Sequence, residues 1–244
     1  MTKFWLFDFD NTIARLEPEV DWAGGRLQLE PFLRSVGAPA DIFEQIPRGN
    51  LPLYDAYRKL LVANGIGPNE NQNLRSASAM IEKIEMAGVD RAQPLEGALE
   101  LLAALRDGGA AIAIVTSNSS RTIKRWFQVN PIGPPNSISV IVGRDSMLAL
   151  KPAPDMIIRA LEELSARPYQ AAFVGDSEAD LLAASAAHLR FYGIAHDDAS
   201  RDRLLRAGEG AGEIFSAPSA LAVHLNLLAP ARLSSKGHNR PLVR

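Results

Sequence analysis

Short apolar runs alternate with helical patterns over much of the chain, and this alternation predicts an α/β fold. The first run, residues 3–7, is short and rich in aromatic residues, which is typical of a buried strand. Further strands are predicted at 111–115, 139–142, 171–174 and 189–194, with a candidate edge strand at 214–215, and helices at 95–106, 120–127, 154–165 and 179–187. This order of elements indicates a doubly wound parallel sheet with helices on both faces.

The stretch between the first strand and Pro94 has a helical pattern instead. Apolar spacing predicts helices at about 27–36, 51–63 and 71–87, and no strand. Pro18 and a pair of adjacent glycines predict that residues 13–25 form a connection. We therefore expect an α/β core domain of residues 1–14 and 91–228, an all-helical domain of residues 15–90 inserted into it, and a flexible tail at 229–244.

Composition excludes several classes of protein. A hydrophobic content of 47% allows a full core, and a net charge of -2 leaves no basic footprint for nucleic acid or an anionic membrane. The chain has no cysteine, which excludes disulfides, thiolate catalysis and cysteine metal sites. Asp8 and Asp10 interrupt the only early apolar run, and no stretch approaches membrane-spanning length, so we expect a cytoplasmic protein.

Two carboxylates follow the first predicted strand. Strand alternation projects Asp8 and Asp10 to the same side of the chain. Their repulsion, added to the desolvation cost beside a buried strand, indicates that a cation or a shared proton compensates them. The alternative is that this short acidic pattern belongs to a turn or a helix cap.

Polar residues also follow the strand at 111–115. Thr116, Ser117 and Asn118 offer hydroxyl and amide groups, and the next helix should begin with free backbone N–H groups. Together these donors are suited to phosphate oxygens. The alternative is an ordinary helix N-cap. In parallel sheets, sites form outside the carboxyl ends of the strands.

A lysine and two further acids complete the set of candidates. Lys151 precedes Pro-Ala-Pro at residues 152–154, just ahead of a predicted helix, although a lone lysine is usually a surface charge. Asp176 and Asp180 follow the strand at 171–174. Taken alone, acids at a helix start are also favourable partners of the helix dipole.

The order of these pieces resembles the haloacid dehalogenase-like hydrolase superfamily, and in particular its phosphoglycolate phosphatase-like branch. Residues 8–12 match the family's DxDx[TV] motif, Thr116 its hydroxyl motif, Lys151 its lysine motif, and residues 175–180 its GDxxxD motif. The resemblance implies that the helical insert is a cap that closes over the site.

The resemblance also implies a role for each candidate. Asp8 would be the nucleophile and Asp10 the general acid and base. Mg²⁺ would be held by the carboxylates of Asp8 and Asp176 and by the main-chain carbonyl of Asp10. The phosphate-binding residues would be Thr116, Ser117, Asn118 and Lys151, with Thr12 and Asp180 in supporting positions.

These roles imply a Mg²⁺-dependent phosphatase that hydrolyses a small phosphorylated metabolite through an aspartyl-phosphate, with no nucleic-acid or membrane partner. Two alternatives remain, a phosphomutase of the same fold and a non-enzymatic phospho-aspartate switch. The sequence fixes neither the substrate nor the choice between monomer and homodimer. Polar candidates for substrate contacts in the insert are Arg15, Glu17, Arg26, Arg34, Arg48, Tyr54, Tyr57 and Arg58, whereas Trp22 is expected to be a packing residue.

Overall fold

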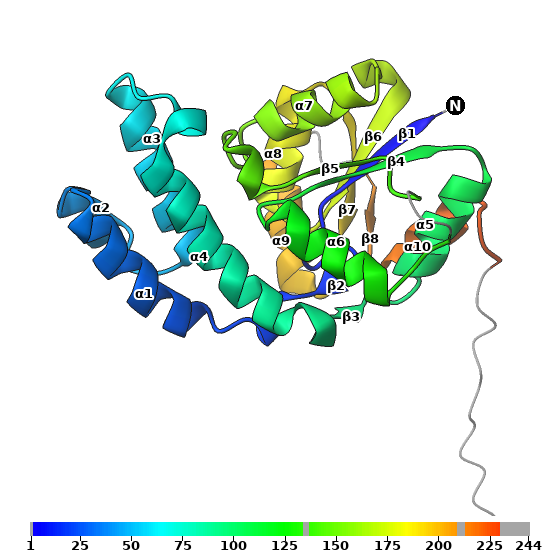
Figure 1. Ribbon diagram of the computed structural model, residues 1–244. Helices are drawn as coiled ribbons and strands as arrows, with labels where there is room; N and C mark the ends of the chain where they lie inside the picture. The colour runs from blue at the N-terminus through cyan, green and yellow to red at the C-terminus, as the bar shows by residue number, and fades with distance from the viewer. Residues whose placement is uncertain (1, 134–136, 209–212, 230–244) are drawn as a thin grey trace, which may run out of the picture.

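Parallel strands form the central sheet of the protein, which a computed structural model describes at residues 2–133, 137–208 and 213–229 (Figure 1). The strands of this sheet are β1 (Phe4–Phe7), β4 (Ala111–Val115), β5 (Val140–Val142), β6 (Ala171–Gly175), β7 (Arg190–Ile194) and β8 (Ile214–Phe215). Their order across the sheet is β5-β4-β1-β6-β7-β8, and every neighbouring pair is parallel. The predicted parallel sheet is confirmed.

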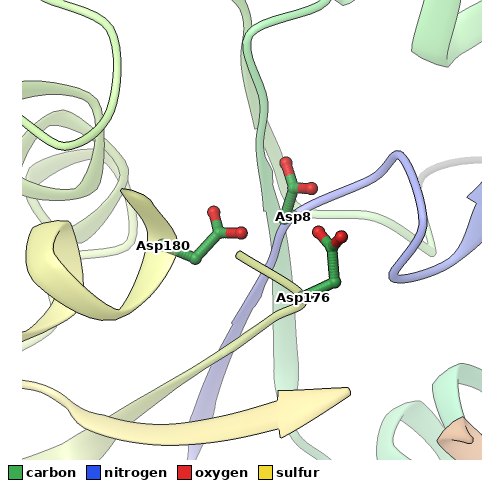
Figure 2. A group of neighbouring side chains, drawn as sticks. All are labelled: Asp8, Asp176 and Asp180. Atoms are coloured by element: carbon green, nitrogen blue, oxygen red, sulfur yellow. The ribbon is translucent and has the colours of Figure 1, made fainter. Parts of the chain in front are cut away.

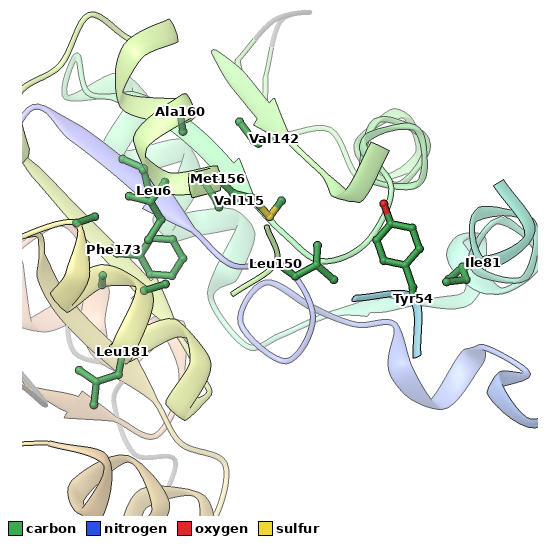
Figure 3. Packing of buried hydrophobic residues seen from close by; sticks show 14 of the residues in the cluster. Leu6, Tyr54, Ile81, Val115, Val142, Leu150, Met156, Ala160, Phe173 and Leu181 are labelled. Carbon is green, nitrogen blue, oxygen red and sulfur yellow. The ribbon is translucent and has the colours of Figure 1, made fainter. Parts of the chain in front are cut away.

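The side chains of β1 are buried on both faces of this sheet. Leu6 is 0% exposed and packs in a cluster with Met156 and Phe173, as Figure 3 shows. Trp5 and Phe7 belong to a second cluster of buried residues on the other face. A strand covered on both sides needs apolar residues at every position, which explains why β1 is a continuous apolar run.

Helices cover the two faces of the sheet in groups. Buried residues reach the Leu6 cluster from α7 (Asp155–Glu163), α8 (Glu178–Ala186) and α9 (Asp198–Ala207), and the other cluster from α5 (Ala98–Asp107), α6 (Ser120–Val129) and α10 (Pro218–His224). Core helices predicted from apolar spacing are present with small shifts at their ends. The expected doubly wound α/β arrangement is confirmed.

The insert forms a group of helices beside the sheet, at the left of Figure 1. These insert helices are α1 (Trp22–Ser35), α2 (Asp41–Gln45), α3 (Asn50–Ala63) and α4 (Gln72–Gly88). Tyr54 and Ile81 of this group lie in the same buried cluster as Leu6, so the apolar packing continues from the sheet into the insert (Figure 3).

Helix α1 begins earlier than its sequence suggests. Residues 13–25 were predicted to be a connection, but the helix starts at Trp22 and includes both adjacent glycines. The Asp21 carboxylate accepts a hydrogen bond from Gly24 N at 2.8 Å, which caps the helix. At Gly25 a Cβ would lie 2.3 Å from Ile84 Cδ1 of α4, so glycine allows the two helices to pack closely.

Two short strands were also missed. β2 (Ala14–Arg15) pairs antiparallel with β3 (Gln93–Pro94), where the chain leaves the sheet region and returns to it. The prediction of no strand before Pro94 is therefore wrong at Ala14, Arg15 and Gln93. A two-residue strand shows no alternation, and the five residues of α2 are likewise too few to show a helical period.

Shorter 3-10 turns link several elements, at Glu17–Glu19, Pro68–Glu70, Val89–Arg91, Arg144–Ser146 and Pro168–Gln170. Within the described residues, no helix is both long enough and apolar enough to cross a membrane. The predicted flexible tail lies outside the described residues from position 230 onward.

Candidate active site

The carboxyl ends of three neighbouring strands bring the predicted site residues together. Phe7 on β1 lies opposite Ile114 on β4 and Val174 on β6, so the residues that follow these strands emerge at one edge of the sheet. They line a cavity of about 200 Å³. Its walls include the following predicted residues: Asp8, Asp10, Thr116, Ser117, Asn118, Lys151, Asp176 and Asp180.

Among the predicted site residues, Thr12 does not line this cavity. It is 1% exposed and lines a small apolar crevice with Ala98 and Leu101. Its hydroxyl oxygen has no hydrogen-bond partner among the described residues. Any support that Thr12 gives the site is therefore indirect, through the packing of the turn after β1.

Lys151 carries the positive charge in this cavity. Its Nζ lies 2.5 Å from Asp8 Oδ1 and forms a second ion pair with Asp180. Burial alone would lower the pKa of the Lys151 ammonium, but the charges of Asp180 and Asp8 outweigh burial and raise it. Lys151 therefore stays charged and is fixed between two carboxylates instead of being solvated at the surface.

The carboxylates of Asp8, Asp176 and Asp180 lie close together at this end of the sheet, as Figure 2 shows. One oxygen each from Asp8, Asp176 and Asp180 lie within 4.8 Å of one another. Burial is the main cause that raises the pKa of Asp8 to about 7 and that of Asp176 to about 8, and the neighbouring carboxylates add to both shifts. When all three carboxylates are ionised, the cluster holds more negative charge than the single ammonium of Lys151 balances.

This donor set fits a hard divalent cation, which takes carboxylate oxygens as ligands. Asp180 is already engaged, because its Oδ2 accepts hydrogen bonds from Ser177 N at 3.1 Å and Ser177 Oγ at 2.6 Å while its Oδ1 contacts Lys151. Asp8 and Asp176 are therefore better placed than Asp180 to hold the ion.

Asp10 is held away from this cluster by the chain that enters the insert. Its Oδ1 accepts hydrogen bonds from the backbone N–H groups of Leu16, at 2.9 Å, and Glu17, at 3.1 Å. Burial raises the pKa of Asp10 to about 6 despite these hydrogen bonds, which lower it. The carboxyl group can therefore exist in both protonation states near neutral pH.

The loop after β4 differs from its prediction in one respect. We expected free backbone N–H groups at the start of α6, but two of them already have carboxylate acceptors. Ser119 N donates to Glu85 Oε2 at 3.0 Å, and Ser120 N donates to Asp145 Oδ1 at 2.7 Å. The expectation missed these acids because each is more than twenty residues away in the sequence.

A second cavity of about 440 Å³ adjoins the first and shares Leu51, Ser117 and Lys151 with it. Its polar wall on α3 is formed by Asp55 and Lys59, which are paired at 2.8 Å. Neither cavity is lined by the polar insert residues proposed from the sequence, all of which are described. Trp22, expected only to pack, lines the smaller cavity.

Comparison with known proteins places the chain in a family. A profile of the haloacid dehalogenase-like hydrolase family matches residues 26–194. The chain belongs to this family. The motifs after β1, β4 and β6 predicted this membership, and the match confirms it.

Several known proteins and solved structures are similar to this hydrolase. Phosphoglycolate phosphatase 1 of Pseudomonas aeruginosa is 26% identical over 195 residues, covering 78% of this chain and 68% of that protein. Protein CbbY of Rhodobacter capsulatus is 26% identical over 203 residues, covering 77% and 83%. A crystal structure of CbbY from Rhodobacter sphaeroides in complex with xylulose-1,5-bisphosphate is 20% identical and superimposes with a TM-score of 0.58, covering 91% and 96%.

Mg²⁺ is expected to stabilise the wild-type hydrolase by about 2.7 kcal/mol at a free concentration of about 100 times Kd. Asp176→Asn should abolish this gain. Burial raises the folded-state pKa of Asp176 from 3.8 to about 8. As the pH rises from 3.8 to about 8, the folded state therefore loses stability relative to the unfolded state, and above about pH 8 this loss is complete. Without metal above about pH 8, Asp176→Asn should therefore be more stable than the wild type. Thermal unfolding with Mg²⁺ and with EDTA measures both effects.

Glu178→Gln is the matched control, because this carboxylate is exposed and lies two residues from Asp176. It should respond to Mg²⁺ as the wild type does. An equal response in Asp176→Asn would contradict the assignment of Asp176 to the metal site.

Proposed function

We propose that this hydrolase is a Mg²⁺-dependent phosphatase that releases phosphate from a small phosphorylated metabolite, with Asp8 as the nucleophile. The observation that carries the proposal is the meeting of Asp8, Lys151 and Asp176 in one cavity at the ends of β1 and β6. A carboxylate nucleophile and a phosphate monoester are both anionic. Their approach therefore requires the kind of positive charge that Lys151 supplies and that the acidic cluster would recruit.

Bound Mg²⁺, held by the carboxylates of Asp8 and Asp176 and by the main-chain carbonyl of Asp10, would neutralise charge on the phosphate oxygens. Asp8 would then attack phosphorus in line, forming an aspartyl-phosphate as the bond to the leaving oxygen breaks. Lys151, already 2.5 Å from Asp8, would stabilise negative charge on the transferred group. Thr116, Ser117 and Asn118, which line the same cavity, would position the group from the β4 side.

Asp10 would handle the proton in both halves of the reaction. In its protonated form it would donate a proton to the leaving alkoxide, and in its ionised form it would accept a proton from the attacking water. The pKa of about 6 allows both states near neutral pH. The backbone N–H groups of Leu16 and Glu17 hold one carboxyl oxygen, which fixes the direction of the other.

The size of the second cavity bears on the substrate. About 440 Å³ adjoins Lys151 on the side of α3, which is in the range of complete ligand pockets. Glycolate, with two carbons, would leave most of this space empty. We therefore infer a leaving group of sugar-phosphate size or larger, with its apolar side against Leu150 and Leu51 and polar groups near Asp55 and Lys59.

Release of inorganic phosphate from a panel of phosphorylated metabolites tests the proposed activity. Wild type should turn over at least one compound with Mg²⁺ and none with EDTA. Asp8→Asn should lower kcat/KM by more than about 1,000-fold, because the nucleophile is lost. The Glu178→Gln control should keep full activity. Metal-independent turnover, or turnover that survives in Asp8→Asn, would contradict the mechanism, and a stable aspartyl-phosphate without phosphate release would favour the mutase or the switch.

The inferred leaving-group site predicts a split between large and small substrates. Ala56→Trp should fill the second cavity, because Ala56 lines it, and should lower kcat/KM for the preferred metabolite by about tenfold or more. Hydrolysis of acetyl phosphate, whose leaving group has only two carbons, should change little. Val62→Trp on the same helix is the control, since Val62 is 50% exposed and does not line the cavity. Equal losses for both substrates would show that the cavity does not hold the leaving group.

A further inference from the structure

A fully buried ion pair lies against the loop after β4, which forms part of the cavity wall. Arg144 Nη1 and Glu85 Oε1 are 2.6 Å apart, and both side chains are 0% exposed. No other ion pair in the described part of the chain has both partners fully buried. A buried pair of this kind is often no more stable than an apolar replacement, so stability alone does not account for it.

The guanidinium of Arg144 has a distinct acceptor for each of its five N–H donors. Nη1 donates to Glu85 Oε1 at 2.6 Å and to the carbonyl oxygen of Ser117 at 2.8 Å. Nη2 donates to Glu85 Oε2 at 3.3 Å and to the carbonyl oxygen of Ser78 at 3.2 Å, and Nε donates to Ser78 Oγ at 3.2 Å. Arg144 is therefore fixed in one orientation, with one bond directed at the loop after β4.

The Glu85 carboxylate is directed at the same loop. Besides Arg144, it accepts hydrogen bonds from Asn118 Nδ2 at 3.2 Å, Ser119 N at 3.0 Å and Thr122 Oγ1 at 3.1 Å. Through Glu85 and Arg144, consecutive residues from Ser117 to Ser119 are each held by at least one bond from this pair. A carboxylate can only accept here, so it determines which way the Asn118 amide faces.

The orientation of the Asn118 amide determines the hydrogen bond that the Thr116 hydroxyl makes. With its NH₂ group directed to Glu85, Asn118 presents Oδ1 to the Thr116 hydroxyl, which donates to it at 3.0 Å. The Thr116 oxygen in turn accepts from Asn118 N at 3.1 Å. Glu85 thus fixes the hydroxyl of a residue that lines the catalytic cavity, although Glu85 itself does not line that cavity.

We propose that Glu85 and Arg144 are positioning residues that hold residues 116–119 in the shape that receives the phosphoryl group. Glu85 comes from α4, an insert helix, and Arg144 from the 3-10 turn after β5, so the loop is held between the insert and the sheet. The phosphate-binding part of this role rests on the proposed phosphatase activity. The hydrogen bonds that hold the loop are a separate property that can be measured directly.

Amide hydrogen exchange and phosphate inhibition in Glu85→Gln test the proposal together. The substitution keeps the size of the side chain but replaces one acceptor oxygen with an NH₂ donor that faces other donors. The amides of Asn118 and Ser119 should exchange about tenfold faster or more, and the inhibition constant of inorganic phosphate, measured with Mg²⁺, should rise about tenfold. The affinity for Mg²⁺ should stay unchanged, because Asp8 and Asp176 do not contact the pair. A general loss of stability would weaken the binding of phosphate and of Mg²⁺ together, whereas the proposal predicts weaker phosphate inhibition with unchanged Mg²⁺ affinity.

Arg125→Met is the matched control. It removes an exposed ion pair between Arg125 and Asp90. This pair also joins α6 to the end of the insert, but it does not contact residues 116–119. Arg144→Lys is the second variant, because it keeps the buried charge while losing the fork that bonds Ser117 and Ser78 at once. It should shift both readouts in the same direction as Glu85→Gln, and it replaces that variant if Glu85→Gln does not fold.

Unchanged exchange at 118 and 119 in a folded variant of either residue would overturn the proposal, whatever the enzyme's activity. Faster exchange with unchanged phosphate inhibition would overturn the phosphate role. If the wild type neither hydrolyses the panel nor binds phosphate, while the loop still loosens in Glu85→Gln, the proposed function would fail and the hold on the loop would stand.

Discussion

The contact of Lys151 with the buried carboxylates of Asp8 and Asp180 sets the charge balance of the cavity. Three carboxylates against one ammonium leave two negative charges when all are ionised. At the 4.8 Å that bounds their nearest oxygens, two such charges repel by roughly 3 kcal/mol at an effective dielectric constant of about 20. A divalent cation would cancel this excess. Burial is the main cause that raises the pKa values of Asp8 and Asp176, and the neighbouring carboxylates add to it.

Strand order is what allows this concentration of charge. β1 lies between β4 and β6 in the centre of the sheet, so residues far apart in the sequence follow parallel strands to one edge. The insert enters and leaves through the β2–β3 pair directly beyond β1, which places the backbone of Leu16 and Glu17 on Asp10. The general acid and base of the proposed reaction is therefore held by the same segment that carries the insert helices.

Much of the core was predictable because its strands are buried on both faces. β4 and the edge strand β8 have the predicted bounds, and the other strands of the sheet differ by a residue. Local motifs predicted the candidate site residues at the strand ends, and the structure brings most of them to one cavity. Glu85 and Arg144 gave no such signal, since they are 59 residues apart and each looks like an ordinary surface charge in the sequence. Asp55 and Lys59 were also missed. Their place in the wall of the second cavity depends on how α3 packs against the core, which no local motif shows.

The measurement that tests the central claim most directly is the site of phosphorylation in Asp10→Asn after exposure to acetyl phosphate and Mg²⁺. Acetate needs no proton to leave, so Asp8 should still be phosphorylated, whereas hydrolysis should stall without the base. After an acid quench, mass spectrometry of the tryptic peptide spanning residues 4–15 should show one added phosphoryl group on Asp8. A phosphoryl group on another residue, or a full single turnover that releases phosphate without labelling Asp8, would contradict the account.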